Sequence, residues 1–206
     1  MSEKDTNTEK AILDAAEQVF LEKGYAAAKT TEIARIARVN HAMLHYYFRT
    51  KENLFNKVFE EKAHLLASSF YSLFDQDLPF VEIVRQAVGG HFDFLVANPR
   101  LPMFVIGEIL TNEERREQVK RILMPKLSLL YASIQKAIDR EVEAGRMKPA
   151  LAVDCMLNVV SLNLFTIVMT QIISYTENGL TEDNNEDFLK HRRENIIQLI
   201  LTSLGL

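Results

Sequence analysis

The sequence predicts an all-α protein, and three observations support this fold class. Apolar residues recur three and four positions apart over most of the 206 residues, which is the spacing of one helix face. No stretch shows the alternation of apolar and polar residues that indicates a half-buried strand. Several glycines and prolines stand where helices are expected to end or begin: Gly24, Pro79, Gly145 and Pro149.

The first helix is expected after a loose polar arm, residues 1–6. Thr6 and Glu9 have the spacing of a capping box at a helix start. Gly24 is expected to end this helix, because glycine readily takes the positive φ of a helix C-terminus. The side chains expected to face the core are Ile12, Ala15, Ala16, Val19 and Phe20.

Residues 30–49 contain two short helix patterns joined by a tight connection. Thr30 is the candidate N-cap of the first helix, and Asn40 is that of the second, which is expected over residues 41–47. The residues expected to face the core are Ile33, Ala34, Ala37, Val39, Leu44 and Phe48. Two short helices connected in this way form a helix-turn-helix. Thr50 is the candidate cap of a long helix that follows from Lys51.

The charge of the chain is distributed unevenly. The formal net charge is −4, but residues 23–57 hold seven Lys or Arg against two acidic residues, a local charge of +5. Basic charge therefore coincides with the helix-turn-helix, which favours binding to nucleic-acid phosphates. The outer face of the second short helix also suits a DNA groove, because it combines small residues with hydrogen-bond donors. This face would present His41, Ala42, Met43, His45 and Tyr46.

From Ile12 to Phe59 the chain resembles the TetR family of bacterial transcriptional repressors. The resemblance rests on the helix ending at Gly24 and on the segments TTEIA, VN, LHYYF and TKENLF, in this order and spacing. It implies a dimeric repressor that releases a palindromic DNA operator when a small molecule enters the C-terminal domain. It also implies a three-helix head, residues 1–50, and a helical effector-binding and dimerisation domain, residues 51–206.

The same resemblance implies which residues meet DNA. The first residues of the second short helix would face base edges, His45 and Tyr46 would hold phosphates, and Lys51 would meet a phosphate from the next helix. The full expected set is Thr30, Thr31, Asn40, His41, Ala42, Met43, His45, Tyr46 and Lys51. Arg38 departs from the family pattern because it stands at the usual turn glycine. Either the turn needs no positive φ here, or Arg38 is strained into it.

The rest of the chain is expected to form further helices, with a kink or a restart at Pro125. Residues 151–173 are the most apolar stretch, but Asp154 and other polar residues within it argue against a membrane span. We therefore expect a helix buried on two faces, one against its own core and one against a partner chain. The resemblance implies that this helix and the last one form a four-helix bundle in a homodimer.

Five residues are candidates for an effector pocket: Met103, Phe104, Asn163, Thr166 and Thr170. The first two offer flexible and aromatic lining. The three polar residues fall on one helix face and could orient a ligand, but each could equally satisfy its own helix backbone or a partner. An apolar or amphipathic effector is favoured, because no cluster of buried charges is expected.

Other functions find less support in the sequence. An enzyme is not expected, because no nucleophile and base, metal cluster or phosphate loop has usable spacing, and no cofactor is implied. His41 and His45 could share a metal, but no third ligand is near. The single cysteine, Cys155, and the polar N-terminus fit a cytoplasmic protein. The main alternative is a protein of the same fold whose head binds a protein, or which lacks an effector.

Overall fold

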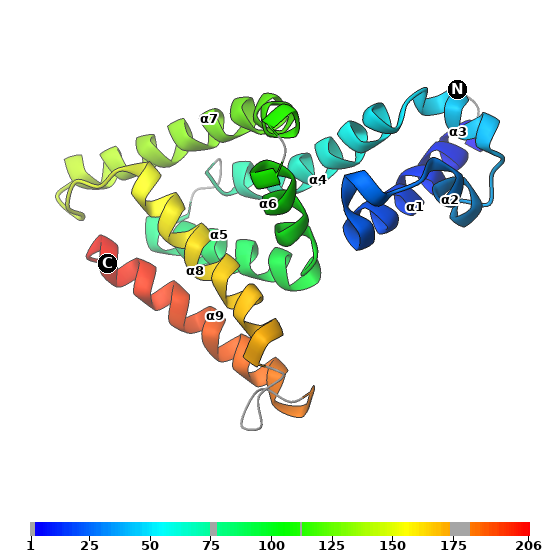
Figure 1. Ribbon diagram of the computed structural model, residues 1–206. Helices are drawn as coiled ribbons and strands as arrows, with labels where there is room; N and C mark the ends of the chain where they lie inside the picture. Colours follow the sequence, from blue (N-terminus) through cyan, green and yellow to red (C-terminus); the bar gives the residue numbers. More distant parts are fainter. Residues whose placement is uncertain (1–2, 75–77, 112, 174–181) are drawn as a thin grey trace. The chain divides into compact units, whose positions relative to one another are not determined.

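The computed structural model describes residues 3–74, 78–111, 113–173 and 182–206. Within these ranges the chain forms nine α-helices and no strand, so the all-α prediction is confirmed (Figure 1). The helices are α1 (Glu3–Ala27), α2 (Thr30–Ile36), α3 (His41–Phe48), α4 (Lys51–Phe74), α5 (Phe80–Ala97), α6 (Leu101–Thr111), α7 (Glu113–Glu143), α8 (Ala152–Ile173) and α9 (Glu182–Leu204).

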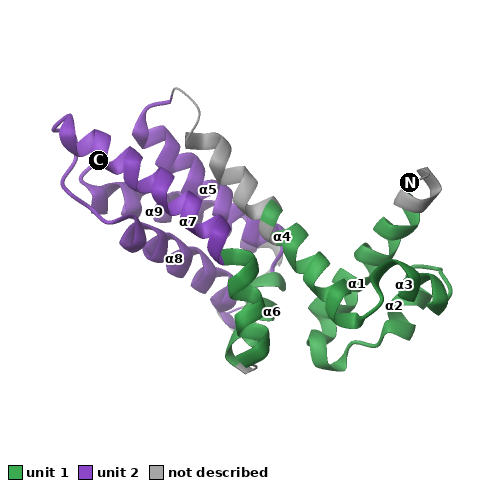
Figure 2. Cartoon of the chain, turned by 90° about the horizontal axis from the view of Figure 1, so that it is seen from above, with its two compact units in different colours: residues 1–65, 100–123 green, residues 66–99, 124–206 purple. Residues whose placement is uncertain are grey.

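The helices divide into two compact units (Figure 2). Unit 1 comprises residues 1–65 and 100–123, and unit 2 comprises residues 66–99 and 124–206. Unit 1 therefore contains α6 and the first part of α7 in addition to the expected head. Both α4 and α7 begin in unit 1 and continue into unit 2. The functional division after residue 50 stays a prediction.

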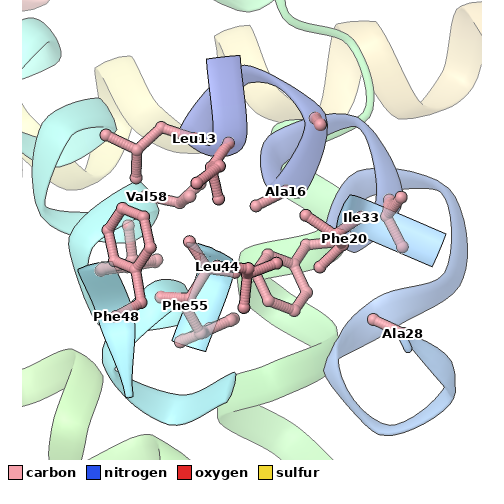
Figure 3. Close-up of a cluster of buried hydrophobic side chains, with 14 of the residues drawn as sticks. Leu13, Ala16, Phe20, Ala28, Ile33, Leu44, Phe48, Phe55 and Val58 are labelled. Carbon is pink, nitrogen blue, oxygen red and sulfur yellow. The ribbon is translucent and has the colours of Figure 1, made fainter. Parts of the chain in front are cut away.

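The core of unit 1 is built from the faces that the sequence predicted (Figure 3). The α1 face is buried, and it meets Leu44 and Phe48 from α3 and Phe55 from α4. Phe55 is 1% exposed, and its ring lies 5.4 Å from that of Phe20 between centroids. The buried α1 side chains are Ile12, Leu13, Ala15, Ala16, Val19 and Phe20. This core places α2 and α3 on one framework with α4.

Two expected helix starts are wrong. α1 begins at Glu3, so Thr6 lies inside the helix and is not its N-cap. α2 is preceded by Lys29 as N-cap, so Thr30 is the first residue of the helix. The sequence pattern could not separate these positions, because threonine is acceptable both at a cap and in a first turn.

Two other boundaries are confirmed, and a third is displaced. Gly24 was expected to end the first helix; it breaks the helical geometry with a φ of 71° that glycine adopts without strain, but α1 continues to Ala27. The Asn40 side chain caps α3 by accepting a hydrogen bond from the amide of Met43 at 2.7 Å. The Thr50 hydroxyl accepts one from the amide of Asn53 at 3.0 Å, which caps α4. α3 is therefore held at its start by Asn40, the N-cap that the sequence predicted.

In unit 2, α5 packs against both α8 and α9, and α8 packs against α9. The apolar face of α9 is buried at Ile196, Ile197 and Ile200. Pro125 lies inside α7, which continues as one helix past it, so the helix does not restart there. Pro125 removes one backbone donor, and it stands two residues after the division between the units.

α8 carries its apolar residues on more than one side. One side contributes buried residues such as Ala152 and Ile167, but Leu157, Phe165 and Ile172 are more than half exposed in the single chain. Residues 152–170 are long and apolar enough to cross a membrane, with a mean hydropathy of 1.8 and 22% of the segment buried. The expected burial of a second face of α8 against a partner chain stays a prediction.

Candidate nucleic-acid interface

The two faces of α3 differ as the sequence predicted. Leu44 and Phe48 are 2% and 6% exposed and anchor the helix in the core of unit 1. The residues that were expected to contact DNA lie on the outer side, where Tyr46 is 80% exposed. The exposed outer residues are His41, Ala42, Met43, His45 and Tyr46. Tyr47, between the two faces, is half-buried and packs against the core.

Arg38 adopts a φ of 56°, so the turn before α3 does need a positive φ, and a non-glycine residue supplies it. Arg49, just after α3, has a φ of 60°. Both arginines are exposed, and they stand on either side of the recognition helix. Residues with side chains tolerate this region poorly, and such strain is often found at functional sites.

Replacing Arg38 by glycine should stabilise unit 1. The left-handed conformation costs a side-chain-bearing residue about 1–2 kcal/mol, and the greater freedom of glycine in the unfolded chain offsets about 0.5–1 kcal/mol of this. We expect a net gain of about 0.5–1 kcal/mol in the free energy of unfolding, measured by urea denaturation. The matched control is Arg35→Gly in α2, which should lose about 1 kcal/mol. Equal losses in both variants would contradict the strain argument.

Thr30 links the two short helices. Its hydroxyl lies 3.0 Å from Nε2 of His41, so the first residue of α2 is hydrogen-bonded to the first residue of α3. The sequence did not indicate this contact, because the two residues are eleven positions apart. The bond fixes the His41 ring at the N-terminus of α3 and leaves Nδ1 as the ring nitrogen directed away from Thr30.

Lys51 has partners within the protein itself. Its ammonium donates hydrogen bonds to the carbonyl oxygens of Tyr25 and Ala28 at 2.8 and 2.9 Å, and to that of Ala26 at 3.3 Å. Burial, and next the Arg115 charge, lower the pKa of Lys51. Lys51 thus holds the segment that connects α1 to α2 instead of pointing outward.

Most of the predicted basic charge is exposed on unit 1. Lys23 is paired with Glu32 at 2.7 Å, and this hydrogen bond lowers the pKa of the Glu32 carboxyl. Lys23 and Lys51 are thus the basic residues of this segment whose charged groups contact other groups of unit 1. The other exposed basic residues of this segment are Lys29, Arg35, Arg38, Arg49 and Lys57.

The predicted effector residues fall into two groups. Met103 and Phe104 lie on α6 in unit 1, where Met103 is exposed and Phe104 packs 5.5 Å from the Phe55 ring between centroids. The three polar residues lie on α8 in unit 2 and are buried. The Thr166 and Thr170 hydroxyls donate to carbonyl oxygens of α8 itself, both at 2.8 Å, which was the alternative left open by the sequence.

Asn163 is fully buried and ties α8 to α5. Its amide nitrogen donates to the Val88 carbonyl oxygen at 3.1 Å and lies 3.0 Å from Nδ1 of His91. Burial lowers the pKa of His91 to about 4, so this ring is neutral at pH 7. Sequence reasoning missed His91, because its position among the apolar residues of α5 gave no signal of a polar partner.

An open depression of about 410 Å³ lies on α7. Its lining residues are Leu129, Ala132, Ser133 and Lys136. None of the five predicted effector residues belongs to it. The structure therefore gives the position of each predicted residue without joining the five in one pocket.

Comparisons with known proteins bear on the helix-turn-helix. Residues 12–58 match the family model described as "Bacterial regulatory proteins, tetR family". The helix-turn-helix segment of this chain is therefore of the TetR family. The match covers most of α1, all of α2 and α3, and the start of α4, so it includes the exposed outer residues of α3. The chain is accordingly a DNA-binding transcriptional regulator.

Individual relatives agree with this assignment. The regulator is 26% identical over 143 residues to the "Fatty acid metabolism regulator protein" of Bacillus subtilis, covering 69% of this chain and 72% of the relative. It is 43% identical over 99 residues to the "HTH-type transcriptional repressor BepR" of Brucella suis, covering 45% of each chain. These relatives are named as regulators of transcription, in line with the expectation that the chain is not an enzyme.

A solved structure shares the fold over almost the whole chain. It is the transcriptional regulator FadR from Bacillus subtilis in complex with stearoyl-CoA, with a TM-score of 0.70 at 19% identity. The match covers 93% of this chain and 96% of that one. The helical C-terminal part, which the family model does not cover, therefore also shares the fold of this solved structure.

Proposed function

We propose that this regulator is a repressor that binds a palindromic operator as a homodimer and is released by a small molecule. One observation carries the proposal. α3 is anchored in the core by Leu44 and Phe48, while its opposite face presents small residues and donors to solvent. A helix with this arrangement can enter the major groove with its first residues against base edges.

The exposed residues of α3 divide into two roles. Those of the first turn, His41, Ala42 and Met43, would meet base edges beside Asn40. His45 and Tyr46 lie further along the helix and would bind phosphates, with Thr30 and Thr31 at the start of α2. The Asn40 side-chain oxygen is used by the cap of α3, so a base could meet only its amide group.

Replacing Tyr46 by phenylalanine should weaken binding to all DNA sequences by a similar factor. The change removes only a hydroxyl from a side chain that is 80% exposed, so the fold should not respond. Loss of one hydrogen bond to a charged phosphate corresponds to roughly a tenfold weaker complex. The check is a titration of both proteins against several duplexes. Losses confined to some sequences would assign Tyr46 to base contacts instead.

The exposed apolar side of α8 supports dimerisation. Leu157, Phe165 and Ile172 are 61%, 64% and 56% exposed, and Leu199 on α9 is 47% exposed. Large apolar residues gathered on one helix usually mark an interface. A homodimer built on α8 and α9 would cover them and place two heads for two half-sites. Sedimentation should show a dimer at micromolar concentration, and Phe165→Glu should shift it toward monomer.

The effector is proposed to be apolar or amphipathic. A long-chain acyl-CoA is the first to test, because the Bacillus subtilis relative is named for fatty acid metabolism and a solved regulator of this fold holds stearoyl-CoA. Stearoyl-CoA added to the protein–DNA complex should lower DNA affinity, whereas coenzyme A alone should not. Equal effects of the two, or none, would point to another effector class. Release requires that the ligand bind the DNA-incompetent conformer more tightly.

A further inference from the structure

A buried polar network lies in unit 1, and it joins α6 and α7 to the segment that matches the family model. Its central residue is Arg115 on α7, which is 5% exposed. The guanidinium carbon stands 3.8 Å from the centroid of the Tyr25 ring and 4.4 Å from that of Phe55. A charge this deep must keep its partners, since an unpaired buried cation is unfavourable. The network therefore has one well-defined arrangement.

The network joins α6 to the end of α1. Arg115 forms an ion pair with Glu108 of α6, with 3.6 Å between Nε and Oε2. The other carboxylate oxygen of Glu108 accepts a hydrogen bond from the backbone amide of Tyr25 at 3.0 Å. Tyr25 directly follows Gly24, where the positive φ turns the chain out of the helix. The break in α1 after Gly24 is thus held by Glu108 through the backbone amide of Tyr25 and by Arg115 through the Tyr25 ring.

The same network joins α7 to the start of α4. Arg115 donates a hydrogen bond to the side-chain oxygen of Gln118, and the Gln118 amide donates to the carboxylate of Glu52. The neighbour of Glu52 is Lys51, which binds the carbonyl oxygens of Tyr25 and Ala28. Residues 25–28 are therefore held from α6, α7 and α4 together.

This corner leads directly to the recognition helix. After the buried Ala28 comes Lys29, the N-cap of α2, and then Thr30, whose hydroxyl is bonded to His41 on α3. A displacement of Glu108 or Arg115 would act on the Tyr25 amide and ring. The displacement would then pass along residues 25–29 to α2. From α2 it would reach His41, the first residue of α3, through the hydrogen bond between Thr30 and His41.

We propose that Arg115 is a positioning residue for DNA recognition. With Glu108 and Gln118 it sets the corner at residues 25–28, and thereby the placement of α3. By linkage, DNA bound to α3 stabilises the same arrangement of α6 and the start of α7. The inference rests on the proposed function, and it adds that the DNA-binding unit includes residues from 100–123.

Hydrogen exchange of the full-length protein tests the inference, with and without a duplex selected for binding from random DNA. In the wild type, duplex binding should slow amide exchange in residues 101–111 and 113–123 by about fivefold or more, although none of these residues is proposed to touch DNA. Slower exchange in α1–α3 alone would overturn the inference and leave DNA binding intact. A wild-type chain that binds no duplex would overturn both.

Variants separate positioning from general stability. In Arg115→Met, duplex binding should no longer slow amide exchange in residues 101–111 and 113–123. The variant should also bind the duplex on the order of tenfold more weakly. Arg115→Lys should restore part of both, because the charge can still pair with Glu108 but the planar stacking is lost. Arg116→Met, at an exposed neighbouring position, should behave as wild type. Glu108→Gln removes the ion pair with Arg115 but keeps an oxygen that can accept the Tyr25 amide, and it serves if Arg115→Met does not fold. Slower exchange of residues 101–111 and 113–123 on DNA binding that survives in Glu108→Gln would overturn the inference.

Discussion

Replacing Phe55 by alanine should lower the free energy of unfolding of unit 1 by about 3–5 kcal/mol and abolish DNA binding with it. Phe55 is 1% exposed at the centre of the core, where its ring meets those of Phe20, Tyr25 and Phe104 within 5.5 Å between centroids (Figure 3). Removal of the ring leaves a cavity that the helices cannot close. Arg115 also loses one of its two stacking partners.

Urea denaturation followed by circular dichroism measures the Phe55→Ala effect, with hydrogen exchange to locate it in unit 1. The matched control is Tyr46→Ala, which removes an aromatic ring that is 80% exposed. That variant should change the free energy of unfolding by less than about 0.5 kcal/mol. A loss below about 1 kcal/mol for Phe55→Ala would mean that the aromatic cluster is not the main support of the DNA-binding unit.

Replacing Met43 by glutamate should weaken DNA binding by on the order of a hundredfold or more without lowering stability. Met43 lies on the exposed side of α3 in its first turn, where a carboxylate would face the phosphates of a groove. The same carboxylate suits the positive end of the helix, so the fold should tolerate it.

Two controls accompany Met43→Glu in a fluorescence titration with the selected duplex. Met43→Gln keeps the length without the charge, and it should change sequence preference more than overall affinity. Met124→Glu makes the same chemical change at an exposed position of α7 and should leave affinity unchanged. If Met43→Glu binds as tightly as wild type, the DNA contact lies on another surface.

The parts of the fold that depend on neighbours in sequence were predictable. The spacing of Leu44 and Phe48 identified the buried face of α3, and Asn40 identified its start, because both signals act within one or two turns of helix. At Arg38 the sequence offered two alternatives, and only the backbone angle decided between them. Thr30 shows the limit of such signals. Threonine suits both the N-cap and the first position of a helix, so the sequence pattern did not show that Lys29 is the N-cap of α2.

The network around Arg115 could not be predicted. Arg115 and Tyr25 are far apart in the chain, and a run of charged residues at 113–117 is typical of an exposed helix face. Lys51 was assigned to phosphate for a similar reason, because nothing local indicates that its ammonium reaches back to the carbonyl oxygens of α1. Contacts of this kind depend on how distant helices pack.

The role of the candidate effector residues could not be decided from the sequence, for a related physical reason. A polar residue on an apolar helix can bind a ligand, a partner or its own backbone, and these choices have the same sequence pattern. In the structure Thr166 and Thr170 bond to their own helix, and Asn163 bonds to α5. The role of these residues toward an effector stays a proposal.

Selection of bound duplexes from a random DNA pool, followed by titration of the selected duplex against salt, tests the central claim most directly. The account predicts a palindromic sequence whose logarithmic affinity falls with logarithmic salt concentration at a slope of about −4 or steeper, because both heads displace counterions from phosphates. Two results would contradict the account: no enriched duplex from a folded, dimeric protein, or a selected duplex whose affinity does not change with salt concentration. Either result would favour a protein partner for the head.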